Sequence, residues 1–412
     1  MYTLKQPSKE KLRDINSYAL VVLAFFMPLS VAIPNIISLF ILLVWLFIGT
    51  FKDDWNQLKN NKVVLAILVY ILVHFIGLLW TNNFEYGLEI VQKNSRLLLI
   101  PFFMLFVKKE HIPYYLYAFI LAITISEIVS YLIFFDVIAP FKHASSMFPT
   151  PFMGHLSYNP YLTIAIYILL FHVFLSDTII KKKHILLYGL FIATMSINMF
   201  ITGGRAGQIM FFAMLVIVIF QIFQKQIFKA TVISLIIISS VFTIAYYNSE
   251  LFKDRMNLIV TEITDYNNNK NTSVGLRLSF TLNSLHVIQE NGFFGTGTGG
   301  FRDAYSEVNK KLSPEIEDPK HPHNMYILEL VELGIIGLFS LIAILFFQIK
   351  HAYYSKDILV KNMGIALPLL FALILLSDTY LSGPRTTMLF IFFSAILYKH
   401  YAKADFSNDK QN

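Results

Sequence analysis

The chain has 412 residues, of which 56% are hydrophobic and 14% are charged, and its formal net charge is +7. Apolar runs of about 16–25 residues recur along it and are long enough to cross a bilayer, which excludes a soluble enzyme. No soluble segment shows a basic face, which argues against nucleic-acid binding. The absence of cysteine excludes disulfides, thiol catalysis and cysteine-bound metals.

The apolar runs predict an all-α, polytopic membrane protein with about twelve transmembrane helices. In chain order these spans are expected near residues 18–33, 36–51, 63–80, 95–107, 113–135, 156–175, 185–201, 208–223, 229–247, 324–349, 363–380 and 386–399. Lysine-rich segments lie in alternate loops, and the positive-inside rule then places both termini in the cytoplasm.

This topology divides the chain into four parts. Residues 1–247 form an N-terminal bundle, 248–322 a long periplasmic loop between spans nine and ten, 323–399 the C-terminal spans, and 400–412 a cytoplasmic tail. The loop is the only segment whose composition resembles that of a soluble protein.

Arginine and lysine are expected on opposite faces of the membrane. Lysine supplies most basic residues of the inner loops, whereas six of the seven arginines fall on the outer face. Because a guanidinium group is always charged and its fork matches phosphate or carboxylate, this distribution predicts an anionic ligand on the outer face. Arg255 and Arg302 have a simpler explanation, since they can be solvated or paired with acids of the long loop.

Arg205 stands in the sequence ITGGRAGQ, at the junction of the seventh and eighth spans. The glycines around it allow close backbone approach to a ligand. An arginine at membrane depth is unfavourable unless it faces a partner or a water-filled cavity, so Arg205 is a candidate ligand-binding residue. The alternative is that the Arg205 side chain extends to the lipid headgroups. Arg96, where the fourth span begins, has the same two explanations, and Arg385 has Asp378 as a possible structural partner.

The outer loop contains an amphipathic helix and a glycine-rich turn. Aliphatic residues recur at helical spacing over 275–290, with Arg277 at the start: Leu278, Leu282, Leu285 and Ile288. A positive charge there is poor for helix stability but suits anion binding. The run GTGTGG at 295–300 has no preceding strand and no Lys-Ser/Thr, so it predicts a tight turn against the membrane rather than a nucleotide loop.

The sequence HPHN at 321–324 immediately precedes a long apolar run. Pro322 suits the first turn of a helix, so the helix is expected to begin near residues 321–323. The helix N-terminus attracts anions and disfavours imidazolium, which would keep His323 neutral, as a general base must be. His321 and Asn324 are expected to support it.

Two acids, Glu329 and Glu332, follow within the apolar run. They can orient a histidine or an arginine, or they can pair within the bundle. The two histidines do not have the i, i+4 spacing of a helical metal-binding pair, and no third ligand is obvious, so the sequence predicts no metal site.

The order of these motifs resembles that of the O-antigen ligase/polymerase superfamily of bacterial inner-membrane glycosyltransferases. It runs from LWTNN and RLLLIP (79–101) through TGGRAG to an arginine that fourteen residues separate from GFFGTGTGGF. HPHN follows, and then E-x-G-x-x-G. The likeness covers most of the chain and is most specific from the loop to HPHN. The family often has serine where this chain has Gly204.

The resemblance implies a role in lipopolysaccharide biosynthesis: transfer of a glycan from undecaprenyl pyrophosphate to a lipid A–core sugar hydroxyl at the periplasmic face, beside membrane lipid and without a cofactor or metal. Arg205 and Arg277 match the family's arginines and would bind the diphosphate, with Arg96 as a further candidate. His323 matches its histidine and would take the acceptor proton, with inversion at the sugar.

Three alternatives to a ligase remain open at this stage. A polymerase would extend a carrier-linked glycan, and a protein O-oligosaccharyltransferase would use protein hydroxyls. A glycan-lipid transporter would be expected to show internal repeats, and none is clear in the sequence. We prefer the ligase because of the HPHN block and the single dominant late loop.

Overall fold

The computed structural model describes residues 8–145, 147–177, 181–266 and 268–400, so the predicted tail lies almost entirely outside the described residues. Within these ranges all regular secondary structure is helical, which agrees with the predicted all-α class. The helices are α1 (Lys9–Phe26), α2 (Ala32–Ile48), α3 (Phe51–Leu58), α4 (Lys62–Gly77), α5 (Phe84–Asn94), η1 (Ser95–Leu98), α6 (Leu99–Met104), η2 (Lys109–His111), α7 (Ile112–Phe134), α8 (His155–Phe174), α9 (Lys182–Ile201), α10 (Arg205–Ile222), α11 (Ile227–Asn248), α12 (Glu250–Thr264), α13 (Ser273–Asn291), α14 (Phe301–Leu312), α15 (Met325–Tyr353), α16 (Ile358–Ile374) and α17 (Pro384–Leu397).

Six helical segments of the described chain are long and apolar enough to cross a membrane: η2 with α7, α8, α9, α10, α11 and α15. The pair α2 and α3, bent by 116°, adds a seventh if it counts as one span, and α4, α16 and α17 are shorter apolar helices. The chain is therefore a multi-pass membrane protein. The count of twelve spans stays a prediction.

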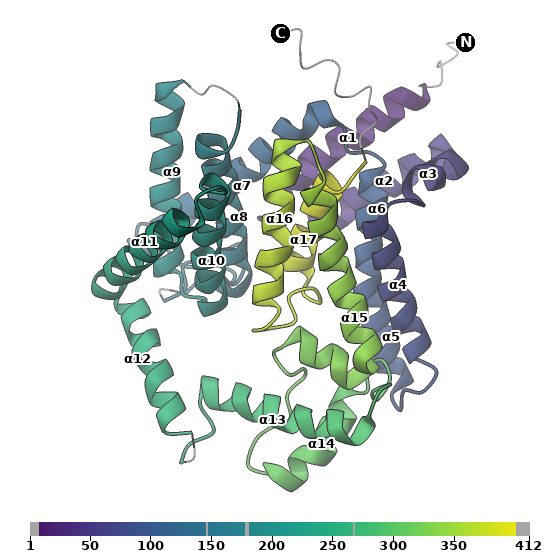
Figure 1. Cartoon of the computed structure of the whole chain (residues 1–412). Helices are drawn as coiled ribbons and strands as arrows, with labels where there is room; N and C mark the ends of the chain where they lie inside the picture. Colours follow the sequence, from purple (N-terminus) through teal and green to yellow (C-terminus); the bar gives the residue numbers. More distant parts are fainter. Residues whose placement is uncertain (1–7, 146, 178–180, 267, 401–412) are drawn as a thin grey trace.

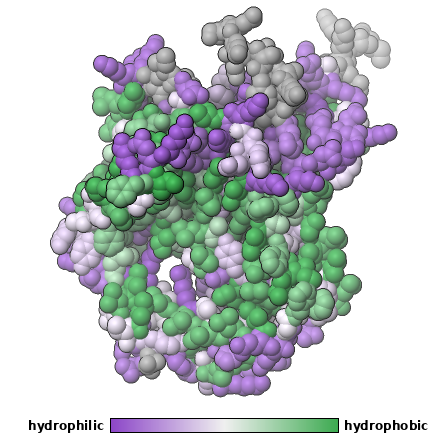
Figure 2. All heavy atoms as spheres, in the orientation of Figure 1, coloured by the Kyte–Doolittle hydropathy of each residue, from purple (hydrophilic) through white to green (hydrophobic). Residues whose placement is uncertain are grey.

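The helices stand roughly side by side, with polar surfaces at the two ends (Figure 1). The space-filling view shows an apolar band between these polar ends (Figure 2). One end, which we call the terminal face, contains the start of α1 at Lys9 and the end of α17 at Leu397. The other end, the distal face, contains α12, α13 and α14 (Figure 1).

The predicted fourth span, 95–107, has the wrong boundaries. The structure has continuous helical backbone from Phe84 to Met104, made of α5, η1 and α6. The apolar run marked only the second half of this segment. The first half contains Glu85, Glu89 and Lys93, and such polar residues hide a helix from a criterion based on apolar length.

Helix α13 covers the predicted amphipathic helix; three of the four stripe residues are exposed, whereas Ile288 packs against the small core that α13 forms with α14. Leu278, Leu282 and Leu285 are 39%, 43% and 44% exposed. The opposite face is buried, where Asn283 Nδ2 donates to Tyr305 OH at 3.2 Å on α14. Helical periodicity identified the element correctly, but the polar network with α14 decided which face is buried.

The predicted long helix after HPHN is broken at Gly334, whose φ of 60° and ψ of −151° are not helical. The glycine-rich turn occupies the break. Thr296 N donates to Val331 O at 2.9 Å, and Gly297 N donates to Glu332 O at 2.8 Å. These bonds satisfy carbonyl groups that the interrupted helix leaves free, which matters because backbone groups at membrane depth need protein partners.

The same turn also contacts α4. Thr298 N donates to Gly77 O at 3.1 Å, and Thr298 Oγ1 donates to His74 O at 2.8 Å. The turn at 295–300 is therefore a wedge between α4 and α15, and it joins the distal helices to the membrane bundle.

Substituting Gly334 with alanine is expected to destabilise this junction. A Cβ there would lie 1.8 Å from Phe293 O, and the backbone conformation alone disfavours alanine by about 1–3 kcal/mol. The thermal unfolding midpoint of purified Gly334→Ala in detergent should fall by several degrees. Gly189→Ala in α9 is the matched control, because a Cβ there meets nothing within 4 Å. Equal midpoints for the two variants would contradict the wedge as a stabilising contact.

Candidate functional site

The HPHN segment lies just before α15 rather than inside it. The helix begins at Met325, and Asn324 is its N-cap, with Oδ1 accepting from Tyr326 N at 3.0 Å and from Ile327 N at 3.1 Å. The predicted start at residues 321–323 was too early. That prediction placed Pro322 in the first turn, whereas the side chain of Asn324 caps the helix and so sets its start two residues later. His323 therefore precedes the cap, in a left-handed conformation with φ of 52°.

A left-handed backbone is unfavourable for histidine and persists only where surrounding contacts hold it. The next residue, Asn324, is fixed by its cap bonds. After it, Met325 N donates to Leu375 O at 2.8 Å and Tyr326 OH donates to Ala372 O at 2.7 Å, which fixes the segment against the end of α16. The strain at His323 is therefore maintained by its neighbours.

Asp378, in the connection between α16 and α17, lies beside both histidines. His321 Nδ1 is 3.5 Å from Asp378 Oδ1, and His323 Nδ1 is 3.3 Å from Asp378 Oδ2, as an ion-pair approach rather than an aligned hydrogen bond. Because Nδ1 of His323 faces the carboxylate, its Nε2 is the nitrogen that remains for a substrate.

The electrostatics keep this carboxylate charged. Burial alone would raise the pKa of Asp378, but its contacts with His323, His321 and the N–H of Thr379 hold that pKa below its ordinary value. Burial lowers the pKa of His321 and outweighs the attraction of Asp378, so His321 is neutral at neutral pH. The site thus combines an ionised acid with a neutral imidazole.

The same three residues have the spacing of a possible metal site. One ligand atom from each of His321, His323 and Asp378 lies within 4.8 Å of the others. The sequence analysis found no third ligand because Asp378 follows the next helix and becomes a neighbour only on folding. The group suits either a small cation or an imidazole–carboxylate pair.

Arg277 lies on α13 close to this cluster. One turn further along α13, the Phe280 ring stacks on His323 with centroids 5.9 Å apart and planes at 19°. Residues three apart share a helix face, so Arg277 is directed to the same side as Phe280. Arg277 interacts electrostatically with Tyr380, two residues after Asp378, and with Arg205. It therefore connects the histidine cluster to the second arginine.

Arg205 is the first residue of α10, and the two glycines before it have left-handed backbones, with φ of 71° and 88°. The buried Asn159 of α8 organises this turn. Asn159 Nδ2 donates to Gly203 O and, at 3.3 Å, to Gly204 O, and its Oδ1 accepts from Thr202 at 2.9 Å. No local sequence pattern indicates this role of Asn159, because Asn159 lies two helices earlier.

Arg205 is incompletely neutralised. Its Nη2 is buried and has no hydrogen-bond partner among the described residues. Arg205 interacts electrostatically with Arg277 and with Arg255 and Glu262 of α12. This group of three arginines and one glutamate has an excess of positive charge. Because the arginines repel one another, the binding of an anion among them would be favourable. Figure 2 shows an opening in the surface between α12 and the membrane helices, on this side of the molecule.

Two other predicted arginines lie outside this group. Arg96 is an exposed residue of η1, and no contact in the described part of the chain joins it to His323. The proposed pairing of Arg385 with Asp378 was wrong: Arg385 Nη1 approaches Pro28 O at 3.5 Å, while Asp378 contacts the histidines.

The two acids of α15 have different surroundings. Glu329 Oε1 accepts from Tyr70 OH at 2.7 Å and lies 3.5 Å from His74 Nε2, so Glu329 pairs within the bundle. The buried Glu332 instead borders a cavity of about 350 Å³ that His321 and Asp378 also line.

Arg302 and Tyr86 complete this cavity. The Arg302 guanidinium carbon lies 3.9 Å from the centre of the Tyr86 ring, and its Nε is buried without a hydrogen-bond partner among the described residues. The sequence analysis had explained Arg302 as a solvated loop residue. Its role as a cavity residue depends on α5 and α14 meeting, which no local pattern indicates.

Part of the chain matches a known protein family. Residues 190–342 match the family model described as O-Antigen ligase, and this segment includes Arg205, Arg277 and His323. An uncharacterized protein of Haemophilus influenzae is 26% identical over 324 residues, which cover 74% of this chain and 75% of the relative. The resemblance noted in the sequence is thereby confirmed over residues 190–342, the part of the chain that the family model matches.

Proposed function

We propose that this protein transfers a glycan from undecaprenyl pyrophosphate to a sugar hydroxyl of lipid A–core, at the periplasmic face of the inner membrane. The observation that carries the proposal is the group of arginines with excess positive charge beside a histidine–aspartate pair. The family match supports a ligase- or polymerase-type glycosyltransferase. Lysine-rich segments at the terminal face support a periplasmic distal face.

The arginines are proposed to bind the donor diphosphate. Arg205 and Arg277 interact electrostatically with each other, and guanidinium forks suit phosphate oxygens. Pyrophosphate is already a good leaving group, so binding it need only neutralise the charge that develops as it departs. Arg96 has no supporting contact and is left as an unassigned candidate.

His323 is proposed to deprotonate the acceptor hydroxyl. Its Nε2 takes the proton as the acceptor oxygen forms a bond to the anomeric carbon, and the bond from that carbon to the phosphate oxygen breaks. The electron pair leaves with the diphosphate, and attack opposite the leaving group inverts the anomeric configuration. Asp378 orients the imidazole through Nδ1 and stabilises the imidazolium that forms.

The cavity beside His321 is proposed to hold the acceptor sugar. It combines the Tyr86 ring with the charged groups of Arg302 and Glu332, and such a mixture of an aromatic face and few polar groups suits a sugar ring. Neither Arg205 nor Arg277 lines it. Donor and acceptor would thus approach the histidine cluster from separate sides.

The acceptor is tested by offering purified protein an undecaprenyl-pyrophosphate glycan with either lipid A–core or a second carrier-linked repeat. We expect a glycan joined to lipid A–core. Product found only on the carrier would identify a polymerase, and turnover of neither acceptor would contradict both assignments.

Replacing His323 with alanine is expected to lower transfer by about 10²–10⁴-fold, the usual contribution of a general base, while donor binding remains. Single-turnover transfer and equilibrium donor binding measure the two effects separately. His286→Ala is the matched control, because His286 is an exposed residue of α13. Loss of donor binding in His323→Ala would indicate a positioning role instead, and normal transfer would exclude the base.

Replacing Arg205 with lysine should lower transfer about tenfold or more, because a lost hydrogen bond to a charged group is worth roughly 1.5–3 kcal/mol. The donor concentration at half-maximal rate should rise. Arg13→Lys is the control: Arg13 bridges Asp54 near the start of α3, at the terminal face. If Arg205→Lys keeps normal kinetics, the paired hydrogen-bonding role is wrong.

Asp378→Asn should slow transfer, because the imidazole of His323 loses the carboxylate that orients it through Nδ1. Single-turnover transfer measures this effect. Transfer by the unaltered protein should not change after EDTA treatment. Activity lost to EDTA and restored by zinc would instead assign His321, His323 and Asp378 to a metal ion.

A further inference from the structure

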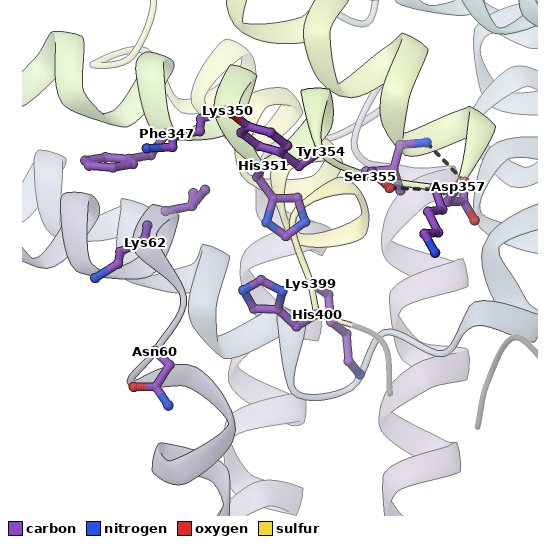
Figure 3. A pocket seen from close by; sticks show the side chains of 13 residues that line it. Asn60, Lys62, Phe347, Lys350, His351, Tyr354, Ser355, Asp357, Lys399 and His400 are labelled. Atoms are coloured by element: carbon purple, nitrogen blue, oxygen red, sulfur yellow. Dashed lines mark hydrogen bonds between the residues drawn. The ribbon is translucent and has the colours of Figure 1, made fainter. Parts of the chain in front are cut away.

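A larger cavity, of about 750 Å³, lies at the terminal face. It forms where the ends of α15 and α17 meet the starts of α4 and α16, so the length of α15 separates it from His323. None of its lining residues belongs to the proposed transfer site. Figure 3 shows it from close by.

The lining of this cavity is strongly basic. Four lysines contribute, each from a different chain segment: Lys62 at the start of α4, Lys350 in the last turn of α15, Lys356 before α16 and Lys399 after α17. Figure 3 shows the His351 and His400 rings facing each other among them, and their centroids are 4.8 Å apart.

Among the described residues that line the cavity, Asp357 is the one acid, and its carboxylate is used elsewhere. Its Oδ1 caps α16 by accepting from Leu359 N at 3.0 Å and Val360 N at 3.1 Å, and its Oδ2 lies 3.9 Å from Lys109 Nζ. Lys399 Nζ donates to Val107 O. The cavity therefore keeps an excess of positive charge.

The cavity also has an apolar side. Phe347, Val63 and Val360 line it, and Phe346, the neighbour of Phe347, is 53% exposed on α15. Along each of these chain segments the lysine lies nearer the terminal face than its apolar neighbour: Lys350 beyond Phe347, Lys62 before Val63, and Lys356 before Val360. Figure 2 shows this polar end of the bundle next to the apolar band. This order of groups matches a phosphate headgroup followed by an acyl chain.

Lysines on this face would also be expected from membrane topology alone. Topology requires only that they lie on one side, and Lys52, Lys59 and Lys225 satisfy it without lining the cavity. It does not require four separate segments to converge on one hollow with an apolar side.

We propose that this cavity binds an acidic phospholipid, with the phosphate among Lys62, Lys350 and Lys356 and an acyl chain along Phe347. Basic pockets between transmembrane helices bind acidic lipid headgroups in this way. The site would couple the packing of α4, α15 and α16 to the lipid of one leaflet, independently of the chemistry at the distal face.

The test is lipid binding to the purified full chain in detergent. Dioleoylphosphatidylglycerol should raise the thermal unfolding midpoint, since a ligand that binds only the folded state stabilises it, whereas dioleoylphosphatidylcholine should not. The triple variant Lys62→Gln, Lys350→Gln, Lys356→Gln should bind roughly a hundredfold more weakly, as about three surface lysines contribute. Native mass spectrometry measures the retained lipid directly.

The control variant, Lys52→Gln, Lys59→Gln, Lys225→Gln, removes the same charge from the same face outside the cavity. It should bind lipid as the unaltered protein does, and both variants should unfold at the same midpoint without lipid. Equal weakening in the two variants would overturn the proposal. Equal stabilisation by dioleoylphosphatidylcholine would also overturn it, because the basic lining of the cavity would then be irrelevant.

Discussion

The insertion of the glycine-rich turn between α4 and α15 is the contact on which the candidate site depends. A helix interrupted at membrane depth leaves carbonyl groups that lipid cannot satisfy, and the turn supplies the missing donors at Val331 and Glu332. The same bonds fix the distal helices against the bundle. Phe280 can then stack on His323, and Arg302 can then reach the cavity beside Glu332. The backbone of residue 334 requires glycine, since a Cβ there would meet the carbonyl group of Phe293, just before the turn.

Two unfavourable features occur together at this site. His323 has a left-handed backbone, and the buried Nη2 of Arg205 lacks a protein partner among the described residues. A substitution at either residue would remove its unfavourable feature if only the stability of the folded state were required. Both become useful when a diphosphate neutralises the arginines and an acceptor hydroxyl meets the imidazole, because the groups are then already in place and little reorganisation is needed.

Charge type separates the two ends of the protein. The distal face has arginines, whose forked groups suit phosphate oxygens, around the proposed donor site. The terminal face has lysines, which act as point charges and gather around the larger cavity. Both ends therefore suit phosphate-bearing lipids, but at the distal end the lipid is the proposed substrate, whereas at the terminal end it is a proposed structural partner.

The sequence by itself determined the helical class, the membrane character and the resemblance to the O-antigen ligase family, because apolar length and motif order are local or linear properties. It also identified Arg205, Arg277 and His323 as candidates from their glycine, helix and proline surroundings. It could not identify Asp378, Asn159 or Arg302, since each acts on residues that are distant in the chain. It misplaced the start of α15, which the Asn324 cap sets. Only the tertiary structure decided these points, because side-chain partners across helices exist only after the helices pack.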